Sequence, residues 1–324
     1  MYHVIVNPAS RSGKGKLLWK DIEPVFKECG AEYKVHFSKR AGHIIEISRE
    51  LSNEVLAKDP TAELNLIVLG GDGTIDEALQ GISDFSRTKI GYVPTGSSND
   101  LARDMGFPKD PRDVVRNILN CKEPFKMDLG VLTYNNMSSE LSRKHEDGVM
   151  SKRYFDVSSG IGFDAAVCEE VLTAPMKTIL NKIGLGKLVY LAVALKQIFT
   201  TKDITATLTL DDQMPMVLKN FLFASFMIHR YEGGGFKFCP DADCTDGILD
   251  LCLVAGISKL TFLMSLPKAM KGKHIGVKGV MVHTAKTINI ETSVPCWVHT
   301  DGEVTCKSSS ITITSQKQAI NFLR

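Results

Sequence analysis

Three short stretches of small and polar residues stand out in the first hundred residues, and each follows an apolar run. They are Asn7–Gly13, Gly70–Thr74 and Thr95–Asp100. Each apolar run predicts a strand, and the residues after each stretch have helical spacing. Ligands bind outside the carboxyl ends of parallel strands, so we expect the three stretches to converge on one crevice. Freed backbone N–H groups and a helix dipole at such corners favour a phosphate.

The second stretch carries an acid among its glycines. Leu64–Leu69 predicts a strand buried on both faces, and the glycines after it allow close approach of a ligand to the backbone. Asp72 would repel a phosphate unless a divalent cation lay between them. Two interpretations follow: a site for nucleotide phosphate and Mg²⁺, or a tight turn in which Asp72 caps the helix.

The first stretch is basic and less specific. Ala9–Lys16 predicts a small flexible loop that lacks the spacing of a Walker P-loop. It suits either a phosphate or a solvated loop. Farther along, Asp128 lies in the apolar strand predicted for Phe125–Val131, and a buried acid there needs a partner or a metal.

Composition limits the class of protein. The chain has 324 residues, 44% hydrophobic and 23% charged, with a net charge of +2, which predicts two domains of an ordinary globular protein and does not indicate a nucleic-acid partner. Met1 leads directly into a strand-like run, and no apolar run is long enough to span a membrane. The eight cysteines show no C-x-x-C pair, which predicts reduced thiols and a cytoplasmic location.

The second half of the chain changes character. After about Leu129 we expect a polar hairpin loop over Tyr134–Arg153 and then many short strands, which predict an antiparallel sandwich or barrel. These expected strands are Tyr154–Ser158, Ile204–Leu210, Met216–Met227, Ile248–Val254, Thr287–Glu291 and Cys296–Thr300. Helices are expected at Pro175–Thr200 and Ser258–Lys271. Both helices lie in lysine-rich segments without acids, so they suit either an anionic membrane surface or the core with solvated lysines.

Two further acidic clusters could bind ligands. Asp243 and Asp246, with a nearby backbone carbonyl, offer hard oxygen ligands for Mg²⁺ or Ca²⁺, or form a simple Asp-Gly turn. Asp301 and Glu303 flank a glycine between two strands. They form a hairpin turn, and they could also place two carboxylates at a substrate hydroxyl.

Taken together, the motifs resemble those of diacylglycerol kinase catalytic domains, in the same order along the chain. The motifs are Asn7-Pro8 with Ser12-Gly13, then Gly70–Thr74, Pro94–Asp100 and Asp301–Glu303. The chain is similar over nearly its whole length to the soluble bacterial lipid kinases, which are related to sphingosine and ceramide kinases. The resemblance implies an α/β fold: a Rossmann-like three-layer nucleotide domain over 1–128 and an antiparallel β-sandwich over 129–310. It also implies an active site in the interdomain cleft and a terminal segment, 311–324, that returns to the first domain.

The resemblance further implies an ATP-dependent lipid kinase whose cofactors are ATP and Mg²⁺. The residues expected to contact ATP are Asn7, Pro8, Ser10, Ser12, Gly13, Ser38, Gly70, Gly71, Asp72, Gly73, Thr74, Glu77, Thr95, Gly96, Ser97 and Asn99. Asp72, Asp100 and Asp128 would hold the catalytic magnesium, largely through water. Asp243, Asp246 and the carbonyl of Ile248 would hold a structural magnesium. Asp301 and Glu303 would form the base region, with Asp72 as a third catalytic residue.

Two positions depart from the pattern of this family, and two functions other than a lipid kinase stay open. Position 76 is Asp where Asn is usual, which adds charge beside the expected metal, and Ser98 replaces a common glycine. A kinase of a soluble substrate such as NAD also carries a GGDGT turn and a β-rich second half. A non-catalytic regulator would bind lipid or nucleotide without turnover. The expected partners are a lipid at an anionic membrane surface, contacted peripherally, and a second copy of the chain in a homodimer.

Overall fold

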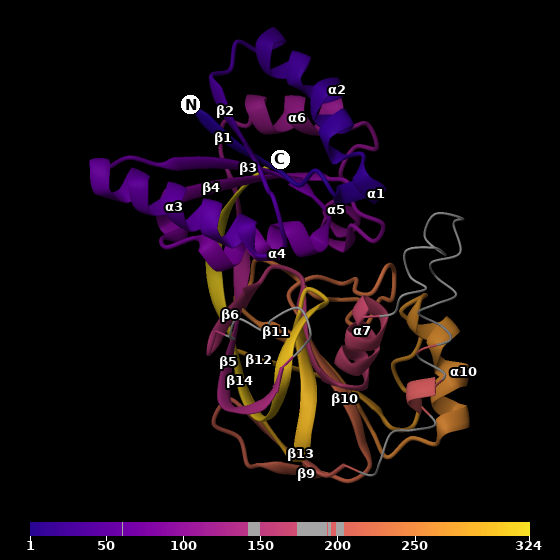
Figure 1. The fold of residues 1–324 in the computed structure, drawn as a ribbon. Coiled ribbons are helices and arrows are strands. Elements are labelled where there is room, and N and C mark those ends of the chain that lie inside the picture. The colour runs from indigo at the N-terminus through magenta and orange to yellow at the C-terminus, as the bar shows by residue number, and fades with distance from the viewer. Residues whose placement is uncertain (60, 142–149, 174–192, 194–195, 199–203) are drawn as a thin grey trace. The chain divides into compact units, whose positions relative to one another are not determined.

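The computed structural model describes residues 1–324 except 60, 142–149, 174–192, 194–195 and 199–203 (Figure 1). It forms two compact units. The first unit contains Met1–Leu129, Cys244–Asp246 and Gln316–Arg324, and the second contains Gly130–Asp243 and Gly247–Ser315. The chain therefore returns to the first unit twice after leaving it.

A five-stranded parallel sheet forms the centre of the first unit. Its order is the end of β14 (Glu303–Leu323), β4 (Thr88–Pro94), β3 (Leu64–Gly70), β1 (Tyr2–Val6) and β2 (Tyr33–Phe37). The last strand joins through parallel pairing of Asn321–Leu323 with Lys89–Gly91. β3 is buried along nearly its whole length, as its continuous apolar sequence predicted, because the sheet is covered on both faces.

Helices cover the two faces of this sheet (Figure 1). α2 (Gly15–Glu28) and α6 (Pro111–Asn120) lie on one face, where Trp19, Phe26 and Val115 pack against Val4 and Val6. α3 (His43–Lys58) and α4 (Asp72–Gly81) lie on the other face and pack against each other. The three-layer α/β prediction for this half is confirmed.

The prediction of a flexible loop over Ala9–Lys16 is wrong. A one-turn helix, α1 (Ser10–Gly13), occupies this segment, and α2 begins at Gly15. Gly13 and Lys14 donate their N–H groups to the carbonyls of Ala9 and Ser10 at 3.0 and 3.1 Å. These local bonds close the turn, which a count of basic and small residues does not reveal.

Antiparallel pairing dominates the second unit, as predicted. The strands β12 (Val280–Ala285), β11 (Leu249–Ala255), β10 (Phe221–Met227), β7 (Ser158–Gly162) and β13 (Thr287–Thr300) are hydrogen-bonded in that order. β13 also pairs with β8 (Ala206–Leu210), which pairs with β9 (Met216–Leu218), and β5 (Phe125–Leu141) pairs with β6 (Lys152–Phe155). One helix, α7 (Phe163–Thr173), follows β7 directly.

Several predicted elements of this unit need correction. Met216–Met227 is two strands, while the two runs predicted at 287–291 and 296–300 form one strand, β13, with a register shift after Glu291. Tyr134–Leu141 belongs to β5 rather than to a loop. Its polar side chains misled the prediction, because Asn135 donates across the strands to Ser310 and Thr312 at 3.2 and 3.0 Å. β12, the full length of β14, and α7 were not predicted.

The two predicted lysine-rich helices have different outcomes. The prediction at 175–200 falls almost wholly outside the described residues. The prediction at 258–271 is confirmed by α10 (Lys259–Ala269), whose Ser258 accepts the N–H of Thr261 at 3.1 Å as an N-cap. Among the described helices, none has the length and apolar character needed to cross a membrane.

Candidate active site

The three polar corners predicted from the sequence touch one another at the carboxyl ends of β1, β3 and β4. Asn7, after β1, donates its side-chain amide to the hydroxyl of Thr74 at 3.0 Å. Thr95, after β4, donates its backbone N–H to the carbonyl of Gly70 at 2.7 Å. Two hydrogen bonds therefore join the three corners. All of the residues that make these bonds belong to the first unit.

Glycine is required where the second and third corners meet. A Cβ added at Gly71 would lie 3.1 Å from the Cα of Gly96, and one added at Gly96 would lie 2.8 Å from the Oδ1 of Asn99 and 2.8 Å from the Cα of Gly71. Any larger residue would separate the corners. The glycines thus bring two backbones together and leave their N–H groups near any ligand at this edge.

Asp72 is held by the third corner and does not cap its own helix. The N-cap of α4 is Gly71, without a side-chain cap. Instead, the Oδ2 of Asp72 accepts the backbone N–H of Asn99 at 2.8 Å. Asn99 has a left-handed backbone with φ 49°, and its side chain accepts the N–H of Gly96 at 2.8 Å and donates to the carbonyl of Gly96 at 3.0 Å. The capping interpretation is therefore wrong.

Two buried hydroxyls at these corners suit a phosphate. Among the described residues, the Oγ of Ser10 and the Oγ1 of Thr95 are buried atoms without a hydrogen-bond partner, and Thr95 is 5% exposed. A buried hydroxyl is normally paired, because leaving it unpaired costs about 1–3 kcal/mol. Phosphate oxygens would accept from both hydroxyls. The donors at the corners therefore fit a nucleotide phosphate.

The other predicted nucleotide residues lie at the same edge of the sheet. Ser38 follows β2 and donates its N–H to the carbonyl of Val6 at 3.0 Å. Pro8 precedes α1 and Gly13 is its last residue, Glu77 is partly buried in α4, and Ser97 is exposed. Ser12 lies in α1, and Gly73 lies in the first turn of α4. Asp76, the departure from the family pattern, is 1% exposed and its carboxylate accepts from Gln80 at 3.2 Å inside α4.

The two other acids predicted to hold the catalytic magnesium, Asp100 and Asp128, are buried and paired. Asp100 begins α5 (Asp100–Asp104), is 6% exposed and lies 3.5 Å from Arg103. Asp128 is fully buried, and its Oδ1 accepts the N–H of Gln318 at 2.6 Å. The sequence predicted a partner or a metal for Asp128. A backbone N–H from the end of the chain provides a partner.

Asp301 and Glu303 lie in a tight hairpin turn between β13 and β14, as expected. Asp301 and Gly302 have φ values of 47° and 81°, and Thr300 pairs with Glu303. The carboxylate of Asp301 accepts three backbone N–H groups, from Asp156, Val157 and Ser158, at 3.0, 3.0 and 2.9 Å. Burial raises the pKa of Asp301, and these N–H groups oppose that shift by stabilising the carboxylate. Glu303 is more exposed than its neighbour Val304.

The acidic segment before β11 is a solvent-facing turn. Asp243 and Asp246 are exposed, Gly247 has φ 82°, and Ile248 is partly buried. Exposed carboxylates beside a glycine turn are compatible with both interpretations drawn from the sequence, a site for Mg²⁺ or Ca²⁺ and a simple Asp-Gly turn.

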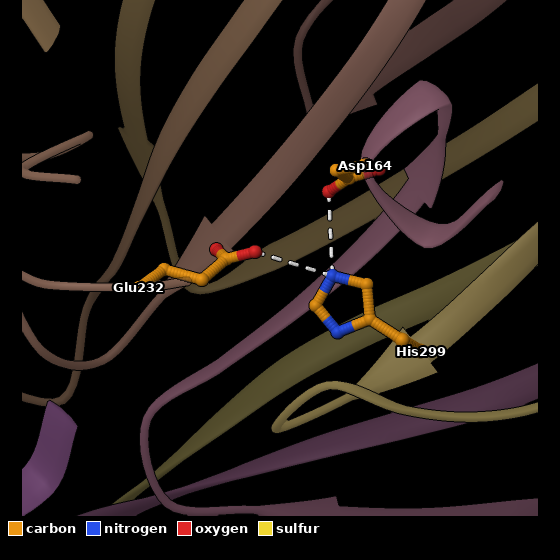
Figure 2. A group of neighbouring side chains, drawn as sticks. All are labelled: Asp164, Glu232 and His299. Atoms are coloured by element: carbon orange, nitrogen blue, oxygen red, sulfur yellow. Dashed lines mark hydrogen bonds and ion pairs between the residues drawn. The ribbon is translucent and has the colours of Figure 1, made fainter. Parts of the chain in front are cut away.

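Sequence reasoning missed one cluster entirely. Asp164, Glu232 and His299 meet in the second unit, and their potential ligand atoms lie within 4.8 Å of one another (Figure 2). Within the described part of the chain, it is the one group of three or more His, Cys, Asp and Glu residues that meets this criterion. Asp72, Asp100 and Asp128 do not meet this criterion among the described residues. No motif links residues so far apart, since 135 positions separate Asp164 from His299.

Comparison with known proteins defines the class. A family model described as the diacylglycerol kinase catalytic domain matches residues 1–132. A second model, described as the YegS C-terminal NAD kinase beta sandwich-like domain, matches residues 157–323. Both models describe parts of kinases, and together they cover most of the chain.

Individual relatives agree with these matches. A Bacillus subtilis (strain 168) protein named "Putative lipid kinase YtlR" is 28% identical over 304 residues, covering 93% of this chain and 92% of its own. A solved diacylglycerol kinase from Bacillus anthracis str. Sterne has a TM-score of 0.67 at 20% identity, covering 99% of this chain and 96% of that chain. An NAD kinase from Archaeoglobus fulgidus, solved in complex with ATP, has a TM-score of 0.51 at 11% identity, covering 100% of this chain and 94% of that chain. The two structures show a shared fold.

The fold and the matched domains therefore define a kinase. The chain belongs to the family of proteins with a diacylglycerol kinase catalytic domain followed by a YegS-type β-sandwich domain.

Proposed function

We propose that this protein transfers the γ-phosphoryl group of ATP to a hydroxyl of a diacylglycerol-like lipid. The observation that carries the proposal is the meeting of three polar corners at Asp72, with the buried hydroxyls of Ser10 and Thr95 beside them. Such a site supplies what phosphoryl transfer needs from a protein, namely positioning and neutralisation of charge. Membership of the diacylglycerol kinase family supports a lipid as acceptor.

The residues of the first unit have distinct roles in this proposal. Backbone N–H groups at the glycine corners, with Ser10 and Thr95, bind the phosphates of ATP. Asp72, Asp100 and Asp128 hold magnesium largely through water, as this ion retains several of its waters in proteins. When bound, the ion would offset charge on the phosphates. The exposed Asp243 and Asp246 and the carbonyl of Ile248 would hold a second, structural magnesium.

Glu303 is the proposed base, and Asp301 has a structural role. Three backbone N–H groups occupy the carboxylate of Asp301. Accepting a proton there would weaken those bonds and loosen the turn. Glu303 stands on the other side of Gly302 and is partly exposed, so its carboxylate can accept the proton of a lipid hydroxyl as the bond to phosphorus forms.

A surface on α10 supports contact with a membrane. Leu260 and Met264, one helical turn apart, are 69% and 66% exposed, while Phe262, Ser265 and Ala269 pack inward. Two further apolar residues, Met270 and Ile275, follow α10 in the sequence and are also exposed. Five exposed lysines occur in the same segment: Lys259, Lys268, Lys271, Lys273 and Lys278. Exposed apolar side chains among cations fit the surface of an anionic bilayer.

This surface can be tested by charge reversal. The double variant Leu260→Glu, Met264→Glu should lose binding to vesicles of phosphatidylglycerol, measured by flotation, because it removes apolar contacts and adds repulsion. Met214→Glu is the matched control, since Met214 is 89% exposed at another place in the second unit. Equal loss of binding in both variants, or full binding by the double variant, would contradict a docking role for α10.

The catalytic proposal is tested by following radiolabelled γ-phosphate into a panel of lipids in vesicles, with NAD as a soluble acceptor. Label should enter a lipid with a free hydroxyl, and Glu303→Gln should abolish the transfer while ATP binding persists. Label in NAD alone would replace the proposal with a kinase of a soluble substrate. Binding of ATP without transfer to any acceptor would indicate a regulator.

A further inference from the structure

The Asp164–Glu232–His299 cluster lies in the interior of the second unit. His299 is fully buried on β13, Asp164 is 9% exposed at the start of α7, and Glu232 is 8% exposed in the segment after β10. The Nε2 of His299 lies 3.3 Å from a carboxylate oxygen of each acid (Figure 2). Gly160 makes this approach feasible, because a Cβ there would overlap Asp164 and lie 2.5 Å from that same Nε2.

The second ring nitrogen of His299, Nδ1, contacts the turn that carries the proposed base. Gly302 donates its backbone N–H to the Nδ1 of His299 at 3.2 Å. A backbone N–H can only donate, so Nδ1 must be unprotonated and Nε2 must carry the hydrogen that faces the two acids. A metal ion on Nε2 would require a ring with no hydrogen on either nitrogen, because Nδ1 accepts from Gly302. This arrangement therefore disfavours a metal site.

One proton of this cluster can be carried by either of two groups, the Nδ1 of His299 or the carboxyl of Asp164. A second ring proton would point from Nδ1 at the Gly302 N–H and break that contact. Burial raises the pKa of Asp164, so its carboxyl can hold the proton instead. The contact with Gly302 therefore depends on where the proton lies.

We propose that His299 is a positioning residue for the Asp301–Glu303 turn. The two acids fix the hydrogen on Nε2, Nδ1 then accepts from Gly302, and the turn is held with Glu303 in place. Asp301 anchors the other side of the same turn through the N–H groups of 156–158. This inference rests on the proposed role of Glu303. It assigns the cluster to the support of that residue rather than to a metal.

Two variants of His299 separate its two nitrogens. Asn places an oxygen near the Nδ1 position and can accept from Gly302, whereas Gln reaches the Nε2 position and leaves Gly302 without an acceptor. His299→Gln should lower kcat by roughly 100-fold, as expected for a misplaced catalytic group, with KM for ATP unchanged. His299→Asn should recover most of that loss. Equal impairment of the two variants would overturn the proposal.

A spectroscopic test on the unmodified protein does not depend on turnover. Nitrogen-15 NMR of the histidine rings should show His299 as the neutral Nε2–H form at assay pH. A proton on Nδ1, or stoichiometric zinc or manganese in the purified protein that is lost in Asp164→Asn, would refute the positioning role. If no lipid is phosphorylated but the ring shows the expected form, the proposed function fails while the link between His299 and the turn stands.

Discussion

Substitution of Asn99 tests how the third corner holds Asp72. Three of the hydrogen bonds of Asn99 join it to the other residues of this site: its N–H reaches Asp72, and its side chain both accepts from and donates to the backbone of Gly96. Its left-handed backbone, with φ 49°, is one that Asn adopts more readily than most residues. The side chain and the backbone therefore contribute separately and can be removed one at a time.

Three variants give a graded series. Asn99→Asp keeps the acceptor and loses the donor, which should cost about 1 kcal/mol of the free energy of unfolding. Asn99→Gly loses both side-chain bonds to Gly96 but tolerates positive φ, so we expect about 2 kcal/mol. Asn99→Ala adds the left-handed backbone penalty of about 1–2 kcal/mol, for a total of about 3–4 kcal/mol.

Urea unfolding followed by fluorescence measures these differences, and calorimetric titration with magnesium and ATP measures their effect on binding. Affinity for the nucleotide should fall in the same order as stability, because a loosened Asn99 also releases the N–H that orients Asp72. Equal stability of the Gly and Ala variants would refute the backbone part of the reasoning. Wild-type stability of Asn99→Gly would refute the side-chain part.

Three further predictions follow from other parts of the molecule. Asp72→Asn keeps an acceptor for Asn99 but removes the negative charge, so kcat should fall by roughly 10²- to 10³-fold with the unfolding transition unchanged; normal turnover would exclude a catalytic role. Gly160→Ala should destabilise the second unit by about 1–3 kcal/mol, measured as a lower unfolding midpoint, because the added methyl group overlaps Asp164; an unchanged midpoint would contradict the packing. Burial raises the pKa of Cys252 to about 12 while Cys29 is exposed, so a thiol reagent at neutral pH should modify Cys29 first and Cys252 only after unfolding, as mass spectrometry would show.

The sequence alone predicts the first unit well because its signals are local. Continuous apolar residues in Leu64–Leu69 indicate a doubly covered strand, the glycines after it indicate a corner, and helical spacing follows. The same alternation around Asn7 and Thr95 predicts that the three corners share one edge of a parallel sheet. Strand direction and connection rules make that inference possible without coordinates.

Prediction is weaker in the second unit because polar residues are ambiguous there. The segment Tyr134–Leu141 has the composition of a loop, yet it belongs to β5, which pairs with β14, and Ser310 and Thr312 of β14 accept the side-chain amide of Asn135. Such pairing depends on which strand lies alongside. A single segment does not carry that information.

What the sequence determined by itself is the set of chemical groups and the local corners that present them: the glycines, Asp72 and the Asp301–Glu303 turn. The tertiary structure decided how each acid is held. Asp72 accepts from Asn99, Asp128 from Gln318, and Asp301 from backbone groups that lie 143 to 145 positions away. The reason is physical: buried carboxylates must be paired, and their partners are backbone N–H groups, which every residue except proline carries and no motif marks.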